Sequence, residues 1–95
     1  MLAVANIAEA DDLNAGAVVN KMTPEDQYTF VAGIVEGLAH ARFASDGHTD
    51  GRSCIYKWFY TEDKTPENIQ AAFARFPEHL PGAVVAAMIT RRCGT

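Results

Sequence analysis

The sequence predicts a single all-α domain over residues 1–95, a compact bundle of four to five short helices around one central helix. Sixteen residues are alanine, which has the highest helix propensity of all residues. Three prolines mark helix starts, at Thr23-Pro24, Thr65-Pro66 and Leu80-Pro81. The third start is the weakest, because leucine is a poor N-cap. A length of 95 residues leaves no room for a second independent core.

The first predicted helix covers residues 13–22, with Asp12 as its N-cap. The central helix is predicted over residues 24–44, where Thr23 caps the start and Pro24 occupies the first helical position. Its apolar residues spread over more than half of the helix circumference, which indicates contacts from several sides. Gly33 and Gly37 lie four residues apart, and a close approach of another helix would offset their low helix propensity.

The composition of residues 46–51 predicts a loop. The aromatic segment that follows, residues 53–60, is compatible with a strand by propensity. A short helix is preferred, because Cys54 and Trp58, like Ile55 and Phe59, would pair across one turn.

The last two predicted helices cover residues 66–76, with Thr65 as the N-cap, and residues 81–92, with Gly94 at the end. No segment gives a persuasive strand signal. The predicted core consists of Tyr28, Val31, Val35, Leu38, Trp58, Phe59, Phe73, Phe76, Val85 and Ile89.

The net charge of −4 argues against nucleic acid as a partner, because phosphate binding needs clustered cations. The single adjacent basic pair, Arg91-Arg92, falls in a predicted last helical turn, where it complements the helix dipole. The composition also excludes a membrane-spanning chain.

Three residues of the predicted loop, Asp46, His48 and Asp50, are weak candidates for metal ligands. Their spacing matches the first positions of a calcium loop, but Lys57 occupies the position where a bidentate glutamate is required. His40 and His48 lack the spacing that aligns two ligands on one helix. We therefore expect no metal and no cofactor.

Catalysis also lacks a signature in the chain. Cys54 with His40 or His48 is a conceivable nucleophile and base, but neither a nucleophile elbow nor a phosphate-binding loop accompanies them. We expect that the protein is not an enzyme.

Arg42 falls within the apolar arc of the central helix. We prefer a side chain that lies along apolar surface with a solvated head, over an ion pair with Asp46 or Asp50. The aromatic residues Tyr56 and Tyr60 are candidate contacts to a partner protein, because aromatic side chains anchor interfaces.

The two cysteines, Cys54 and Cys93, allow one disulfide in an oxidising compartment and would both be reduced in the cytosol. The first residues include neither a basic segment nor a full apolar segment, so we expect no complete signal peptide. Ala8-Glu9-Ala10 has the form of a cleavage site, so residues 1–10 are either the remnant of a targeting segment or an ordinary N-terminal extension.

The chain resembles the small cysteine-containing domain of type VI secretion immunity proteins, the Rap/Tai family, and more broadly the HdeA-like helical proteins. The matching features are the central segment Tyr28 to Leu38, Cys54 after a polar loop, the amphipathic segment Ile69 to Phe76, the turn Phe76-Pro77-Glu78-His79-Leu80 and the final segment Ala83 to Cys93. Members of the family often carry a further cysteine in the first helix, which this chain lacks.

The resemblance implies a helical domain with a Cys54–Cys93 disulfide that is periplasmic or secreted. It implies a protein as the partner, such as a secreted cell-wall hydrolase, which is blocked sterically. The alternative is a structural or homodimeric domain without catalytic activity, and a metal- or small-molecule-binding protein is a third reading. A cytoplasmic location remains the alternative to export.

Overall fold

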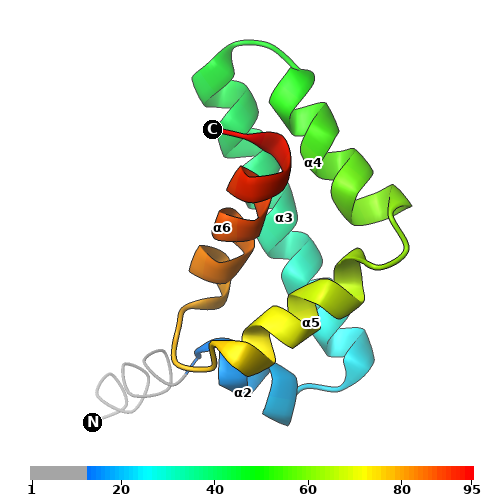
Figure 1. The fold of residues 1–95 in the computed structure, drawn as a ribbon, viewed down its shortest axis with the longest axis vertical. Helices are drawn as coiled ribbons and strands as arrows, with labels where there is room; N and C mark the ends of the chain where they lie inside the picture. Colours follow the sequence, from blue (N-terminus) through cyan, green and yellow to red (C-terminus); the bar gives the residue numbers. More distant parts are fainter. Residues whose placement is uncertain (1–12) are drawn as a thin grey trace, which may run out of the picture.

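The computed structural model describes residues 13–95, and this part of the chain contains five helices and no strand (Figure 1). The all-α prediction is therefore confirmed. The predicted small-x-small site and the cap at Asp12 lie outside the described residues. The helices are α2 (Ala15–Lys21), α3 (Pro24–Asp46), α4 (Asp50–Thr61), α5 (Thr65–Arg75) and α6 (Pro81–Cys93).

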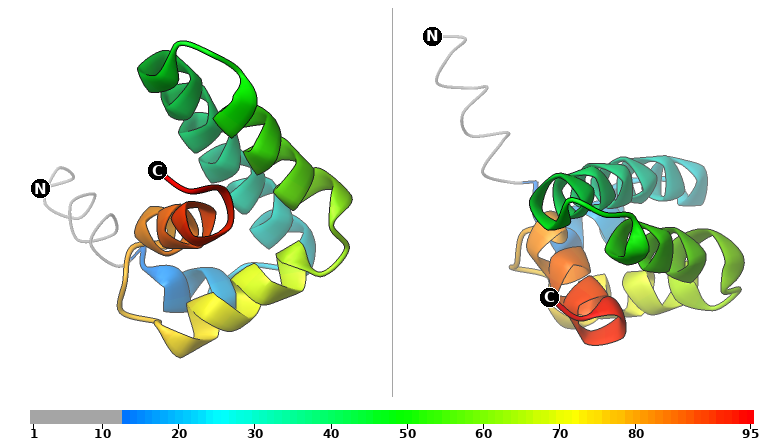
Figure 2. Two further views of the ribbon diagram at one scale, coloured as in Figure 1. Left: turned by 45° about the horizontal axis from the view of Figure 1, so that its top comes forward. Right: turned by 90° about the horizontal axis from the view of Figure 1, so that it is seen from above.

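The longest helix, α3, forms an antiparallel hairpin with α4, and α2 packs against α5 at the lower end of the hairpin (Figure 1). Seen from above, α5 and α6 lie on the same side of the α3–α4 pair (Figure 2). Helix α6 contacts each of the other four helices. It therefore joins the hairpin to the α2–α5 pair.

Helix α3 starts as predicted and ends later than predicted. The Thr23 hydroxyl accepts a hydrogen bond from the Asp26 amide at 3.1 Å. Gly47 caps the C-terminus of the helix, and its φ of 74° is the left-handed conformation that glycine adopts most readily. Asp46 is thus the last residue of α3 and Asp50 the first of α4, which corrects the predicted loop over residues 46–51.

The start of α2 is joined to the turn between α5 and α6. Asn14 is the N-cap in place of the predicted Asp12, so α2 begins at Ala15, two residues later than predicted; the Asn14 side chain accepts from the Ala17 amide at 2.9 Å. The Gly16 amide donates to the Pro77 carbonyl at 2.9 Å, and a Cβ at Gly16 would lie 2.9 Å from the Pro77 side chain. Glycine is needed here because the two backbones approach closely.

Helix α5 does not use Thr65 as its N-cap. Thr65 is instead the first residue of α5 and is buried in the core, and its hydroxyl donates to the Trp58 carbonyl at 2.6 Å. The cap position is occupied by Lys64, which makes no side-chain capping bond. Thr65 therefore satisfies a carbonyl near the end of α4.

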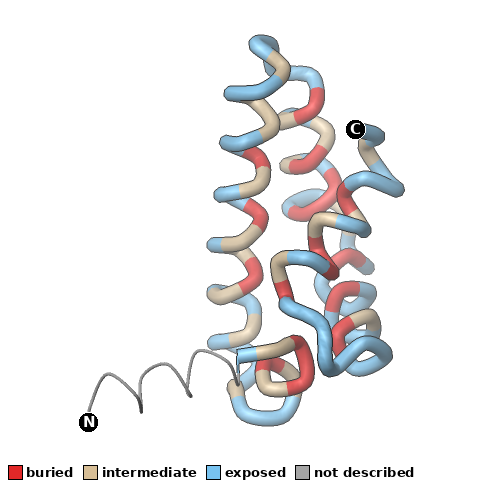
Figure 3. The backbone as a smooth tube through the Cα atoms, turned by 90° about the vertical axis from the view of Figure 1, so that its left-hand side faces the viewer, coloured by how far each residue is buried: buried red, intermediate tan, exposed pale blue. Residues whose placement is uncertain are grey.

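The core runs along the side of α3 that faces the other helices, where buried positions recur once per turn (Figure 3). The described part of the chain buries Ala15, Val18, Val31, Val35, Ala39, Ile55, Trp58, Phe59, Ile69, Phe73, Val84, Val85 and Ile89. Seven of the ten predicted core residues are among them. Leu38 is half-buried, whereas Tyr28 and Phe76 are 46% and 44% exposed and were predicted wrongly.

The predicted close helix contact at Gly33 and Gly37 is also wrong. No atom lies within 4 Å of a Cβ built at either glycine, and both residues are exposed. The two glycines therefore lie on an open face of α3.

We expect the double substitution Gly33→Ala/Gly37→Ala to raise the free energy of unfolding by about 1–2 kcal/mol, because alanine costs less backbone entropy in a helix. Urea unfolding measures the change. Gly47→Ala is the matched control: it also meets no neighbour, but its left-handed backbone should make the change destabilising by about 1 kcal/mol. A loss of stability in the double variant would contradict the conclusion that nothing packs against Gly33 and Gly37.

Candidate functional site

Two tyrosines of α4 meet one glutamate of α3. The Tyr56 hydroxyl donates to Glu36 Oε1 at 2.9 Å, and the Tyr60 hydroxyl donates to Glu36 Oε2 at 2.6 Å. The tyrosines lie four residues apart, so their rings share one face of α4, with centroids 5.9 Å apart. One carboxylate therefore fixes the orientation of both phenol groups.

A third tyrosine extends the cluster along α3. Tyr28 stacks on the buried ring of Phe59 at 5.4 Å, and Tyr60 meets the same ring edge-on at 4.9 Å. Tyr28 and Tyr60 remain 46% and 47% exposed. We call Tyr28, Glu36, Tyr56 and Tyr60 the tyrosine surface.

The hydrogen bonds fix the charge of this surface at neutral pH. The bonds from Tyr60 and then Tyr56 lower the pKa of Glu36. The bond to Glu36, with smaller contributions from burial and from the charge of Glu36, raises the pKa of Tyr60 to about 12. The bond to Glu36 likewise raises the pKa of Tyr56. Glu36 is consequently negative and both hydroxyls are protonated.

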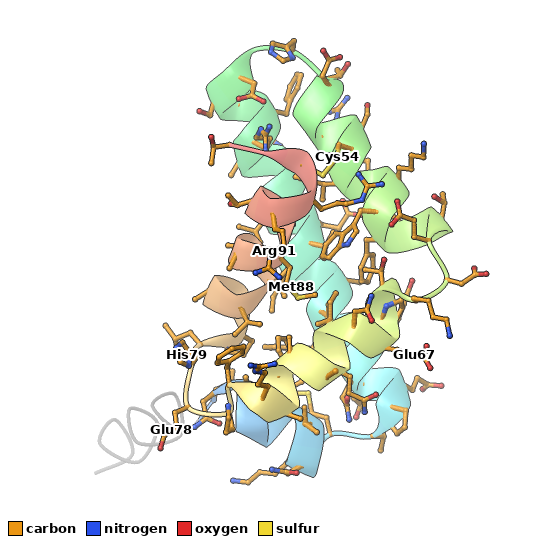
Figure 4. The ribbon with its side chains drawn as sticks, in the orientation of Figure 1. Cys54, Glu67, Glu78, His79, Met88 and Arg91 are labelled. Carbon is orange, nitrogen blue, oxygen red and sulfur yellow. A yellow bond between two sulfur atoms is a disulfide. The ribbon has the colours of Figure 1, made fainter. Side chains whose placement is uncertain are left out.

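A groove of about 200 Å³ lies between α3, α4 and α5, and Tyr28 of the tyrosine surface is one of its lining residues. Its apolar lining comes from Val31, Phe59, Ile69 and Phe73. Its polar lining comes from Gln27, Glu67 and Gln70. Figure 4 shows Glu67 on α5, far from Glu78 and His79 in the α5–α6 turn.

One wall of the groove is held by a glutamine. The Gln27 side chain donates to the Met22 carbonyl at 3.0 Å and to the Val19 carbonyl at 3.3 Å. It also accepts from Gln70 at 3.5 Å. These bonds connect the end of α2 with α3 and α5, so the groove is formed by the fold itself.

We expect stability to fall between about pH 10 and pH 12, because the unfolded chain loses the Tyr60 proton near 10 and the folded chain near 12. Glu36 gives the opposite trend: its contribution is fully present above the ordinary glutamate pKa of 4.5 and is lost as pH falls through the lowered folded pKa. Urea unfolding across alkaline pH measures the first effect. Tyr60→Phe should reduce the loss of stability between about pH 10 and pH 12, whereas Tyr28→Phe should leave that loss unchanged. Equal pH profiles for the two variants would contradict the assignment of the loss to Tyr60.

The structure does not assemble the weak metal candidates into a site. Asp46 points toward Arg42, while His48 Nδ1 lies 3.9 Å from Asp50 Oδ2 in an exposed pair. Within residues 13–95, no group of three or more His, Cys, Asp and Glu residues is placed to hold a metal ion.

Arg42 makes an ion pair with Asp46, so the preferred prediction of a solvated Arg42 guanidinium is wrong. Its Nε donates to Asp46 Oδ2 at 2.7 Å. Its two terminal nitrogens donate to the carbonyls of Gly94 at 2.9 Å and Cys93 at 3.3 Å. Arg42 therefore links the end of α3 with the end of α6.

The basic pair Arg91-Arg92 lies in the last turn of α6, as predicted, and Arg92 forms an ion pair with Glu62.

Cys54 of α4 and Cys93 of α6 form a disulfide with an S–S distance of 2.10 Å (Figure 4 labels Cys54). They lie 39 residues apart in the sequence. The conceivable pairing of a Cys54 thiolate with a histidine base is thereby removed, because this sulfur is bonded.

Sequence reasoning selects Tyr56 and Tyr60 but misses Glu36 and Tyr28 as parts of the same surface. The helical pattern places Glu36 on the polar stripe of α3 and Tyr28 in the core. A detectable signal does exist: two phenol groups on one helix face need an acceptor, and Glu36 is an acid on the neighbouring helix.

No described helix combines the length and the apolar character needed to cross a bilayer. Comparison of the chain with protein-family models, with curated proteins and with solved structures gives no match.

Proposed function

We propose that this chain is an exported protein-binding domain of the immunity or chaperone type, which acts sterically by covering a site on a partner protein. The observation that carries the proposal is the exposed tyrosine surface beside a preformed apolar groove. The resemblance to the Rap/Tai family suggests a secreted cell-wall hydrolase as the partner.

The tyrosine surface has the properties of an interface anchor. Tyrosine offers a large contact area, and ordering its side chain on binding costs conformational entropy. Here Glu36 already holds Tyr56 and Tyr60 in the free protein. The entropy cost of binding is consequently reduced, which favours affinity without additional contacts.

The disulfide supports the exported part of the proposal. Disulfides persist in oxidising compartments and are rare in the cytosol. The Cys54–Cys93 bond joins two helices of a small domain, and such domains gain much of their stability from cross-links.

Site-specific photo-crosslinking in the cells that naturally produce the chain tests the proposal. A photoreactive amino acid at Tyr60 should give an adduct with a different protein. The same amino acid at Ala87, exposed on α6, serves as the matched control and should give none. Failure to form an adduct at Tyr60, or equal adducts at both positions, would count against a partner at this surface.

Self-association is the second candidate function, and a separate surface favours it. Leu13, Phe76 and Leu80 are 40%, 44% and 66% exposed. They flank the place where α2 meets the α5–α6 turn. Analytical ultracentrifugation over a range of concentrations tests this candidate: a dimer that Leu80→Glu dissociates would support it, and a monomer at all concentrations would reject it.

A further inference from the structure

Glu36 carries a negative charge that no described cation neutralises. None of the ion pairs within residues 13–95 includes Glu36. Its two hydrogen-bond partners are neutral phenol groups. The basic residue one turn before Tyr56 is Arg52, and its guanidinium stacks over Phe43 at 4.4 Å. Glu36 thus remains available to an external cation.

The tyrosine surface is chemically suited to a cationic side chain. A carboxylate has about four acceptor positions, and the two hydroxyls occupy two of them. Aromatic faces attract cations through the ring quadrupole, most strongly arginine. A guanidinium beside Glu36 would gain charge-assisted hydrogen bonds and aromatic contacts together.

We propose that the tyrosine surface receives an arginine or lysine side chain of the partner protein while an apolar side chain of the same partner segment enters the groove. The inference rests on the proposed function and names the chemistry of the partner. Charge complementarity supports it, since Glu36 and Glu67 are both acidic. Glu67 lies 3.7 Å from Lys64, but both of those side chains are largely exposed.

The spacing within the partner follows from α3. Glu36 and Tyr28 lie eight residues apart, which is about 12 Å along a helix. Tyr28 lines the groove, and so does Val31, which lies five residues before Glu36. The partner segment therefore places its cation and its apolar side chain roughly 8–12 Å apart, equivalent to five to eight residues of a helix.

Selection from a phage library of random peptides tests the inference on the full, disulfide-bonded chain. We expect the enriched peptides to contain a basic residue and a large apolar residue. Changing the basic residue to glutamine should weaken binding at least about tenfold, equivalent to about 1.4 kcal/mol. Amide shifts in NMR spectra should cluster at Tyr28, Glu36 and Tyr60.

Two protein variants give the matched comparison. Glu36→Gln should abolish the preference for the basic peptide, while circular dichroism shows the fold intact. Glu78→Gln makes the same change of net charge in the distant α5–α6 turn and should leave binding unchanged (Figure 4). Equal losses in both variants would show general electrostatic attraction and overturn the inference.

Three further outcomes would overturn it: no enriched peptide, enriched peptides without a basic residue, or binding of spermidine alone with the same dependence on Glu36. The last would identify a small cationic ligand in place of a protein. A crosslinked partner at Tyr60 together with peptide binding that ignores Glu36 would overturn this inference alone. Peptide binding that needs Glu36, without any crosslinked partner, would overturn the proposed function alone.

Discussion

Replacement of both disulfide cysteines, Cys54→Ala/Cys93→Ala, is expected to lower the free energy of unfolding by about 3–4 kcal/mol. The bond closes a loop across 39 residues, and the chain-entropy estimate for such a loop is about 4 kcal/mol. Domains of this size are stabilised by only about 5–10 kcal/mol in total. The melting temperature should therefore fall by roughly 15–25 °C.

Urea unfolding with and without a reductant measures this effect and supplies its own control. Reduction of the wild-type chain should lower its stability to nearly that of the double variant, whereas the double variant should not respond to the reductant. When protein from its native source is alkylated before reduction, its intact mass should show no added alkyl group, because both sulfurs are held in the disulfide. Two alkylated thiols would contradict both the disulfide and the export that it supports.

The helices were predictable because their signals are local in the sequence. Thr23 and Pro24 fix the start of α3 through one capping bond and one fixed backbone angle, and both are readable from adjacent residues. Gly94 ends α6 as expected. The helical reading of residues 53–60 was also correct, because four-residue pairing outweighs the strand propensity of the aromatic residues.

The candidate site was less predictable because it depends on the register between helices. The periodicity of α3 places Tyr28 on the apolar stripe but does not show where the neighbouring helices end. Tyr28 lies at the rim, where it covers Phe59 and remains half exposed. The hydrogen bonds from α4 to Glu36 join residues that are 20 and 24 positions apart in the sequence, so no local sequence pattern predicts them.

The preferred reading of Arg42 failed for the same reason. A helical wheel shows an arginine within an apolar arc, but it does not show that the end of α6 returns to this position. The carbonyls that accept from Arg42 lie 51 and 52 residues away. The ion pair with Asp46 was visible as an alternative, because it needs only helical spacing.

Substitution of Arg42 by methionine is expected to lower the free energy of unfolding by about 2–3 kcal/mol. Methionine retains much of the apolar stem but removes three hydrogen bonds from a charged donor, each of which contributes about 1.5 kcal/mol or less when partly solvated. The Arg42 and Asp46 side chains are 18% and 22% exposed, so water compensates for only part of the loss. Arg75→Met is the control, because it removes the same charge from an exposed position and should change stability by less than about 0.5 kcal/mol.

The effect of Arg42→Met should depend on the disulfide, because Arg42 and Cys93 hold the same end of α6. Without the disulfide, this end separates more readily, and the bonds from Arg42 to its carbonyls contribute less. The combined variant should therefore be destabilised by less than the sum of the separate effects, as a double-mutant cycle measures. Gly51→Ala provides an independent approach, since its Cβ would lie 2.5 Å from Arg42 Nε and displace the guanidinium. Strict additivity between Arg42 and the cysteines would show that the two links act on separate parts of the fold.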